Sequence, residues 1–332
     1  MSAPVQPGFE TLAVPSEAAE ALALAETPFQ QVWRTLRQDR LAMLGLVVLV
    51  VLLVLAFFGK LLTEWWVVFD PATVRLPDKL LPPFSVASAA LAKELVPPFG
   101  LYPFGTDELG RNVFARMLQG SFVSLSVGIV AVSISLSIGI TVGGLAGYYG
   151  KRKLGFISVD SWLMRITDIV LCFPTFFLIL TVVALLPPSI YNIMIVIGIT
   201  SWMGTARFVR AEFLALRDQD FVTAAQALGL PEWRIIFRHM VPNAMAPVLV
   251  SATIDVAYAI LTESALSFLG FGVRPPYATW GNILADGRSY IFDAPWLFVI
   301  PGCAILVVVL AFNLLGEGLR DAMNPKLRKR AS

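Results

Sequence analysis

The chain has 332 residues, of which 57% are hydrophobic and 14% charged, and its mean hydropathy is +0.75. This composition excludes an ordinary water-soluble domain, and a net charge of only +2 gives no indication of nucleic-acid binding. The two cysteines, Cys172 and Cys303, lie within apolar stretches, which argues against a disulfide framework or a zinc cluster. We therefore expect an all-α membrane protein.

The first 40 residues are expected to form a polar segment that ends in a surface helix. Residues 1–27 are rich in Ala, Glu and Pro and are expected to be disordered or loosely helical. They lack the basic start and short apolar core of a cleaved signal peptide. In residues 28–40, apolar and basic side chains occupy separate helical faces (Phe29, Trp33 and Leu36; Arg34, Arg37 and Arg40). This pattern is typical of a helix on a membrane surface, and a plain extension of the first span is the alternative.

Six apolar stretches are predicted to cross the membrane. The first span is residues 41–62. It is followed by a polar loop, residues 63–116, which contains seven prolines. Thr106 or Asp107 is expected to cap the helix that leaves this loop. A core of residues 117–319 then contains the other five spans: 117–150, 166–186 with Pro174 inside, 190–206, 244–269 and 297–315.

Within the second span, small residues recur at every fourth position: Ala131, Ser135, Gly139, Gly143 and Gly147. Residues with this spacing lie on one face of a helix. A face of small residues lets a second helix backbone approach closely inside a membrane. We expect this stripe to pack against protein and to have no role in ligand binding.

The distribution of basic residues predicts the orientation. Six spans place both chain ends on the same side, and 17 of the 25 Lys and Arg residues lie in segments on that side. Basic residues are enriched on the cytoplasmic side of membrane proteins. Both termini, the loop 207–243 and the basic tail 320–332 are therefore expected in the cytoplasm, and the loop 63–116 outside it.

The cytoplasmic loop carries strong local structure signals in the polar stretch Asp218–Asn243. Asp220 is predicted to be the N-cap of a helix Phe221–Leu228. Gly229 stands where a left-handed residue would end that helix, and Pro231 is placed to start the next one. A flexible loop would not need such caps, so we expect a rigid unit that contacts a partner.

Residues suited to catalysis are scarce. His239 is the single histidine, and a lone histidine is usually a surface or packing residue. The chain contains no G-x-x-x-x-G-K-[ST] phosphate loop, no H-E-x-x-H pair and no G-x-S-x-G nucleophile motif. We therefore expect no enzymatic activity and no metal or cofactor in this chain, so that any energy from ATP must come from a partner.

Several stretches together resemble a known family. The cytoplasmic stretch, with Thr223-Ala224-Ala225, Gly229 and Val241-Pro242, resembles the EAA loop of permease subunits of bacterial ATP-binding cassette (ABC) importers. Four further stretches are similar to the C-type permease of dipeptide, oligopeptide and nickel importers: PFGTDELGR at 103–111, ESALSFLGFGVRPP at 263–276, WGNIL at 280–284 and FNLLGEGLRDAMNP at 312–325. The chain departs from the family pattern at Thr223, which replaces an acidic residue, and at Asn112, where Asp is frequent.

The resemblance implies the type I ABC importer permease fold in a bacterial or archaeal inner membrane. It also implies a homologous second permease, two cytoplasmic ATPase subunits or domains that bind ATP and Mg²⁺, and an extracytoplasmic substrate-binding protein. The helix 221–228 would be the coupling helix, seated through its small residues in a groove of an ATPase. The residues implied in coupling are Asp220, Phe221, Thr223, Ala224, Ala225, Leu228, Gly229 and Arg234.

Asp255 and Glu263, on the fifth span, are the candidate residues of the translocation path. An ionised carboxylate inside a membrane costs about 2.5 kcal/mol or more. Both are therefore expected to face the bundle interior, the partner permease or water. Asp255 is expected either to line or gate the path or to form a hydrogen bond between helices, and Glu263 to form a hydrogen bond with a neighbouring loop.

The substrate stays open among peptide-like solutes. The resembled family favours dipeptides and oligopeptides, with nickel complexes and glutathione as alternatives, because the binding protein largely sets selectivity. An ion-coupled secondary transporter is disfavoured by the lack of an obvious internal repeat. A membrane-embedded enzyme is disfavoured because one histidine and two scattered cysteines provide no clustered site.

Overall fold

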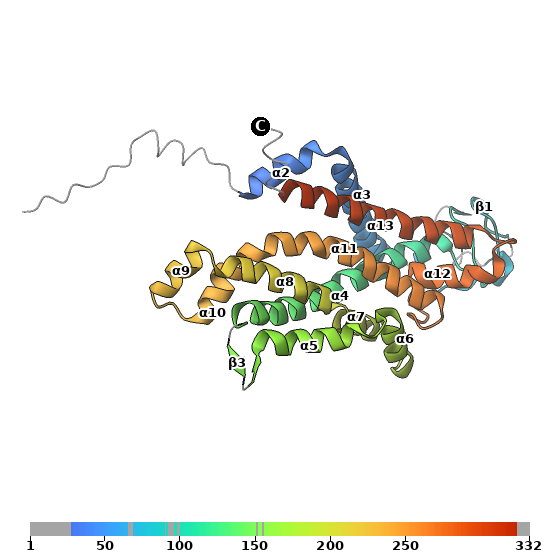
Figure 1. Ribbon diagram of the computed structural model, residues 1–332. Coiled ribbons are helices and arrows are strands. Elements are labelled where there is room, and N and C mark those ends of the chain that lie inside the picture. Colours follow the sequence, from blue (N-terminus) through green and yellow to red (C-terminus); the bar gives the residue numbers. More distant parts are fainter. Residues whose placement is uncertain are drawn as a thin grey trace, which may run out of the picture.

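The computed structural model describes residues 28–65, 69–89, 91, 96–97, 100–150, 152–154 and 156–323. The predicted disordered segment 1–27 and most of the predicted basic tail, residues 324–332, lie outside these ranges. The described chain is an elongated bundle of helices (Figure 1). At one end lie α9 (Asp220–Ala227) and α10 (Glu232–Arg234), and at the other lie α12 (Trp280–Gly287) and the short strand β1 (Ser85–Val86).

Four helices are long and apolar enough to cross a membrane: α3 (Arg40–Trp65), α4 (Val113–Tyr148), α11 (Val241–Phe268) with the helical turns before it, and α13 (Trp296–Met323). Two bent helix pairs supply the other crossings: α5 (Val159–Leu171) with α6 (Thr175–Leu185), and α7 (Ile190–Thr200) with α8 (Trp202–Arg217). With each pair as one crossing, the described residues form six spans. The fold is therefore the all-α membrane bundle that the sequence predicted.

The third and fourth spans are broken, which the sequence analysis did not predict. α5 and α6 meet at 77°, and Pro174, expected inside a helix, is the N-cap residue before α6. Proline lacks the N–H that a helix interior needs and its ring clashes with the preceding turn, so the helix stops there. α7 and α8 meet at 41° around Ser201, and α8 continues well beyond its predicted end at Ala206.

The stripe of small residues on α4 packs against protein, as predicted: its three glycines meet α8, and Ala131 meets Gly198 of α7. Ala131 and Ser135 also line a cavity, which was not expected. All five stripe residues are buried. A Cβ atom at Gly143 would lie 2.3 Å from the carbonyl oxygen of Ala206, and one at Gly147 would lie 2.5 Å from Cβ of Phe213. The two backbones therefore approach more closely than any side chain would permit. This contact fixes α8 against the main hydrophobic core, which α4, α7, α11 and α13 share.

The surface helix predicted near the N-terminus is α2 (Pro28–Gln38), and it is separate from α3. Asp39 divides the two helices, and its Oδ1 accepts hydrogen bonds from the N–H groups of Leu41 (2.9 Å) and Ala42 (3.2 Å). Leu36 is buried, and its Cδ1 lies close to Gly318 of α13. The alternative of a plain extension of the first span is therefore wrong, whereas contact with the membrane surface stays a prediction.

Short elements connect the spans. The long loop before α4 contains η2 (Leu76–Asp78) and a small antiparallel sheet of β1 with β2 (Leu101–Tyr102). The buried Asp78 carboxylate accepts a hydrogen bond of 2.6 Å from the Tyr102 hydroxyl, and burial, followed by this bond, raises the pKa of Tyr102. A hairpin of β3 (Lys153–Leu154) and β4 (Ile157–Ser158) joins α4 to α5, and η5 (Arg288–Tyr290) follows α12.

The cap of α4 differs from the prediction. Asn112, rather than Thr106 or Asp107, is the N-cap residue, and its Oδ1 accepts the N–H of Phe114 at 3.0 Å. The Thr106 hydroxyl instead accepts a hydrogen bond of 2.8 Å from the N–H of Leu81 and so joins two parts of the long loop. Asparagine caps a helix as well as aspartate does, so this departure from the family pattern keeps the local structure.

Asp107 belongs to a buried ionic cluster that the sequence analysis missed. Its Oδ2 lies 2.7 Å from Nε of Arg111 and 2.6 Å from Nη1 of Arg116. Arg116 also contacts Asp286 of α12 through Nη2 at 2.8 Å. The cluster joins the long loop, the start of α4 and the segment between α11 and α13. Asp107, Arg111 and Arg116 are close together in the sequence, but Asp286 lies 170 residues after Arg116. The sequence therefore gave no indication that Asp286 belongs to this cluster.

Candidate functional site

The predicted coupling segment forms an elbow of two helices, residues 220–234, at one end of the bundle (Figure 1). Its first helix, α9, begins at Asp220, and the N-cap is Gln219, which makes no side-chain cap bond. The prediction of Asp220 as the N-cap was therefore wrong by one residue. Asp220 lies in the first helical turn, where its negative charge still interacts favourably with the helix dipole.

Gly229 ends α9 in the predicted left-handed conformation, with φ of +73°. Its N–H donates to the Gln226 carbonyl at 2.9 Å, and the N–H of Leu230 donates to the Ala225 carbonyl at 3.2 Å. These two bonds form a Schellman motif, a common rigid helix ending. Among the described residues, no atom lies within 4 Å of a Cβ built at Gly229. Backbone conformation, and not space, therefore selects glycine here.

One face of the elbow is anchored in a hydrophobic cluster of its own. Val222 and Ala225 of α9 are buried with Phe213 of α8 and with Ile235 and Met240, which follow α10. Ala225 thus packs on the chain itself, so it does not belong to the surface that a partner could reach. The cluster fixes the elbow to α8 and to the start of α11.

The other face of the elbow is apolar and exposed. The large side chains on it are Phe221 (37% exposed), Leu228 (80%) and Trp233 (60%), and Phe237, just after the elbow, is also exposed (68%). Thr223 and Ala224 are also exposed, and the Arg234 guanidinium lies over the Trp233 ring, 5.4 Å from its centroid. Clustered apolar side chains on a rigid, protruding surface mark a protein-interaction site.

A π-helix, η4 (Ile235–Met240), joins the elbow to α11. The N–H of Val241 donates to the carbonyl of Ile236, five residues earlier. The next residue, Pro242, has no N–H to continue an α-helical pattern, which accounts for the wider turn at this point. The sequence pair Val241-Pro242 contained this signal, but the π-helix itself was not predicted. Such turns occur frequently at functional sites.

Ion pairs connect the elbow to the segment after α4, and α8 to the third span. Arg152, after α4, pairs with Glu232 of α10. Arg210 of α8 binds both carboxylate oxygens of Asp160 on α5, with Nη2 2.6 Å from Oδ2. Arg207 of α8 pairs with the α5 residue Asp168. Exposed pairs of this kind contribute little stability, but the bidentate, partly buried Arg210 pair fixes the orientation of α8 relative to α5.

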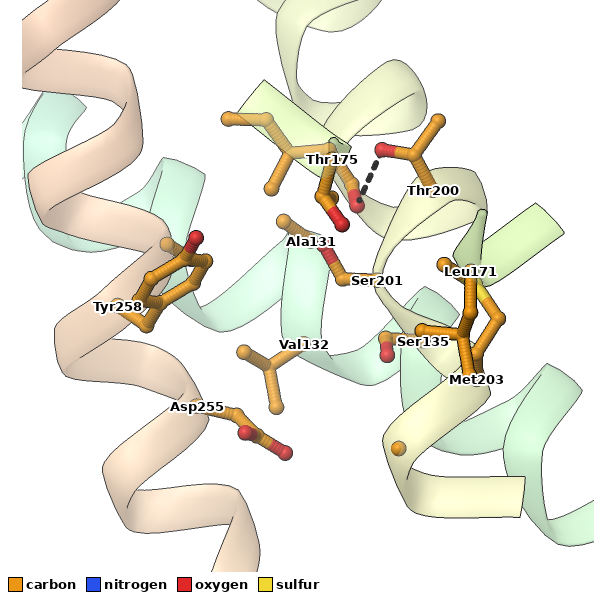
Figure 2. A pocket seen from close by; sticks show the side chains of 13 residues that line it. Ala131, Val132, Ser135, Leu171, Thr175, Thr200, Ser201, Met203, Asp255 and Tyr258 are labelled. Atoms are coloured by element: carbon orange, nitrogen blue, oxygen red, sulfur yellow. Dashed lines mark hydrogen bonds between the residues drawn. The ribbon is translucent and has the colours of Figure 1, made fainter. Parts of the chain in front are cut away.

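Asp255 lies beside a cavity of about 190 Å³ whose lining also includes the exposed side chains of Leu171 and Tyr258 (Figure 2). The cavity is formed where both helix breaks meet α4 and α11. Thr175 at the start of α6 and Ser201 at the α7–α8 break line it, as does Tyr258 one turn beyond Asp255. Thr205 of α8 also lies near the Asp255 carboxylate. The sequence analysis identified Asp255, but not the hydroxyl groups that line the same cavity.

Glu263 lies apart from that cavity and is fully buried. Its Oε1 accepts a hydrogen bond from the Ser267 hydroxyl at 2.7 Å, and its Oε2 lies 3.4 Å from the Ser124 hydroxyl. Ser124 in turn accepts the N–H of Trp280, the first residue of α12, at 3.3 Å. Glu263 therefore joins α11 to α4, and Ser124 extends this link to α12. Its role is a structural hydrogen bond, as expected, but the bond across the bundle is made to a neighbouring helix, whereas a loop partner was expected.

Comparison with known proteins identifies relatives over almost the whole chain. Residues 139–329 match the family described as binding-protein-dependent transport system inner membrane component. Residues 27–83 match the N-terminal TM domain of oligopeptide transport permease C. The chain is 38% identical to a dipeptide transport system permease protein of Alkalihalophilus pseudofirmus, over 92% of each chain. It is 36% identical to an oligopeptide transport system permease protein of Bacillus subtilis, over 88% of each chain. A di/tripeptide transport system permease protein of Pseudomonas aeruginosa is 38% identical over 92% of this chain and 94% of its own.

Proposed function

The chain belongs to the family of binding-protein-dependent transport system inner membrane components, and from this premise we propose that it carries peptides across a bacterial inner membrane. It forms half of the translocation path of an ATP-driven importer, and a homologous permease forms the other half. The names of its relatives support di- and oligopeptides as cargo. A binding protein outside the membrane delivers the peptide.

The energy comes from two ATPase subunits or domains, which bind ATP and Mg²⁺ and dock on the elbow. The observation that carries this assignment is the exposed apolar face of the elbow on a helix that is itself rigidly anchored. Phe221, Leu228 and Trp233 offer the large apolar side chains that dominate protein interfaces. The chain itself acts as a transport subunit and hydrolyses no ATP.

The elbow and both termini lie in the cytoplasm in this proposal. The excess of Lys and Arg in the segments at that end of the bundle supports the orientation. The long loop with the buried Asp107–Arg116 cluster then lies outside, where the binding protein docks.

Movement of the elbow is transmitted through rigid contacts. Closure of the ATPase pair shifts α9 as a rigid body. The cluster around Phe213 passes this shift to α8 and α11, and the Arg210–Asp160 pair passes it from α8 to α5. The breaks between α5 and α6 and between α7 and α8 lie beside the cavity. At these breaks the outer halves of the third and fourth spans can change their orientation.

Leu228→Asp tests the docking surface. A charge at this exposed position cannot disturb the chain's own core, but it places an unpaired carboxylate in the proposed interface. We expect the variant to assemble with the second permease and to retain less than about one tenth of the bound ATPase, since an interface hot spot contributes about 2 kcal/mol or more. Copurification of the ATPase with the tagged permease measures the effect.

Leu76→Asp is the matched control, because Leu76 is also an exposed leucine but lies in the loop at the opposite end of the bundle. It is expected to retain the full complement of ATPase. A Leu228→Asp complex with as much ATPase as the control would contradict the proposed docking site.

A further inference from the structure

The cavity beside Asp255 contains a carboxylate in an unusual position. Asp255 lies halfway along α11, a span of 28 residues, and an acidic side chain at mid-span costs about 2.5–3.5 kcal/mol in a membrane. Such residues are rare and usually mark a path or site for a ligand. The described residues that line the cavity include no Lys, Arg or His that could neutralise the charge.

Ser201 supplies a second, independent observation. Its Oγ is buried and has no hydrogen-bond partner among the described residues, and Figure 2 shows its side chain directed into the cavity. A buried hydroxyl without a partner is costly. It therefore indicates a group that occupies the cavity during part of the transport cycle.

The helix break at Ser201 adds backbone groups. α7 ends at Thr200 and α8 begins at Trp202, so the last carbonyl groups of α7 and the first N–H groups of α8 lack their usual helical partners. Of these, the Ile197 carbonyl accepts a hydrogen bond of 3.3 Å from the Thr200 hydroxyl, which leaves the others to a ligand. Broken helices in transporters place such groups at substrate sites. A peptide backbone, which has both donors and acceptors, can satisfy both kinds of group.

We propose a subsite in which Asp255 binds the amino-terminal ammonium group of the peptide as it crosses the membrane, and in which the hydroxyl groups of Ser201 and Thr175, farther along the same cavity, contact the peptide backbone (Figure 2). The inference rests on the proposed function and specifies which part of the substrate the permease contacts. The ammonium group is the cation that every unmodified peptide carries. A lining with one carboxylate and no basic side chain favours this end of the peptide over its carboxylate end.

The subsite is tested by protection of an introduced thiol in the assembled complex. Cys172 and Cys303 are exposed and are first replaced by alanine; Ser201→Cys then places a thiol in the cavity. The rate of labelling by a small maleimide is measured with increasing trialanine or N-acetyl-trialanine. We expect half-maximal protection at about tenfold lower concentrations of trialanine, because only it forms the charge-assisted bond.

Asp255→Asn in the same background is expected to abolish the difference between the two peptides. Asp321→Asn, which removes an exposed carboxylate at the end of α13, is the control and should preserve it. Thr175→Cys reports on the same cavity if the Ser201→Cys complex does not assemble. An N-acetylated peptide with one lysine tests whether a side-chain ammonium group can replace the amino terminus.

Several results would overturn the subsite: equal protection by both peptides, protection by neither, a difference that persists in Asp255→Asn, or equal protection by the acetylated lysine peptide. Uptake by the parent complex tests the proposed function separately. ATP-driven peptide uptake without selective protection contradicts the subsite alone, whereas the absence of such uptake contradicts the proposed function.

Discussion

At the scale of single residues, glycines in the left-handed region mark the turns that other residues cannot make. Gly110 has φ of +71°, and a Cβ atom there would lie 1.8 Å from the carbonyl oxygen of Arg75. Gly270, after α11, has φ of +87° but no atom of the described residues within 4 Å of such a Cβ. An added side chain would meet both backbone strain and a steric clash at Gly110, but only backbone strain at Gly270. Comparing substitutions at the two positions therefore separates the two effects.

Gly110→Ala is expected to destabilise the protein by roughly 3 kcal/mol or more, because backbone strain adds to a direct clash in the loop that carries Asp107. Gly270→Ala should cost only about 1–2 kcal/mol from its backbone conformation. The midpoint of thermal unfolding of the purified complexes provides the comparison. Equal shifts for the two variants would show that the close approach to Arg75 is unimportant.

At the scale of elements, the close contact between α4 and α8 depends on glycines, which have no side chain to keep the two helices apart. Gly143→Leu would force the two helices apart at Ala206 and is expected to reduce the yield of assembled complex about tenfold or more, since overpacking costs about 1–3 kcal/mol per site. Size-exclusion chromatography of the tagged complex gives the yield. Ser137→Leu, on the exposed face of the same helix, is the control and should assemble normally. Normal assembly of Gly143→Leu would mean that the stripe is not a packing surface.

The sequence predicted the elements to the extent that local chemistry determines them. Long apolar runs predicted α3, α4 and α11 within a few residues, because membrane thickness sets their length. The start of α13 was also predicted, but the helix continues eight residues beyond the predicted end at Leu315, to Met323. The break at Ser201 and the extension of α8 to Arg217 were missed. They depend on tertiary contacts, such as the pairing of Arg210 with Asp160, that leave no local pattern.

At the scale of the whole molecule, the candidate site was predicted only in part. The elbow was recognisable because its helix ending uses local hydrogen bonds around Gly229. The buried side of the elbow and the cavity beside Asp255 were not, since segments far apart in the sequence form them. Ser201 and Thr175 have no distinctive sequence context, and only the meeting of two broken spans brings them to the cavity that Asp255 also lines.

Coupling of the elbow to the translocation path also involves the whole molecule. In this account a rigid elbow is required for coupling, even where the docking surface itself is intact. Gly229 provides the test, because its substitution alters the backbone angle between α9 and α10 without removing an exposed apolar side chain. Asparagine tolerates the left-handed conformation, whereas a β-branched valine does not.

The most direct measurement is ATP-driven peptide uptake by proteoliposomes that contain the complete importer, with each rate divided by the amount of bound ATPase. The Gly229→Asn complex should transport at nearly the parent rate. The Gly229→Val complex should assemble but transport about tenfold more slowly or worse, since valine opposes the left-handed conformation by roughly 1–2 kcal/mol. A Gly229→Val complex with a full complement of ATPase and the parent rate of uptake would contradict the role of the elbow in coupling.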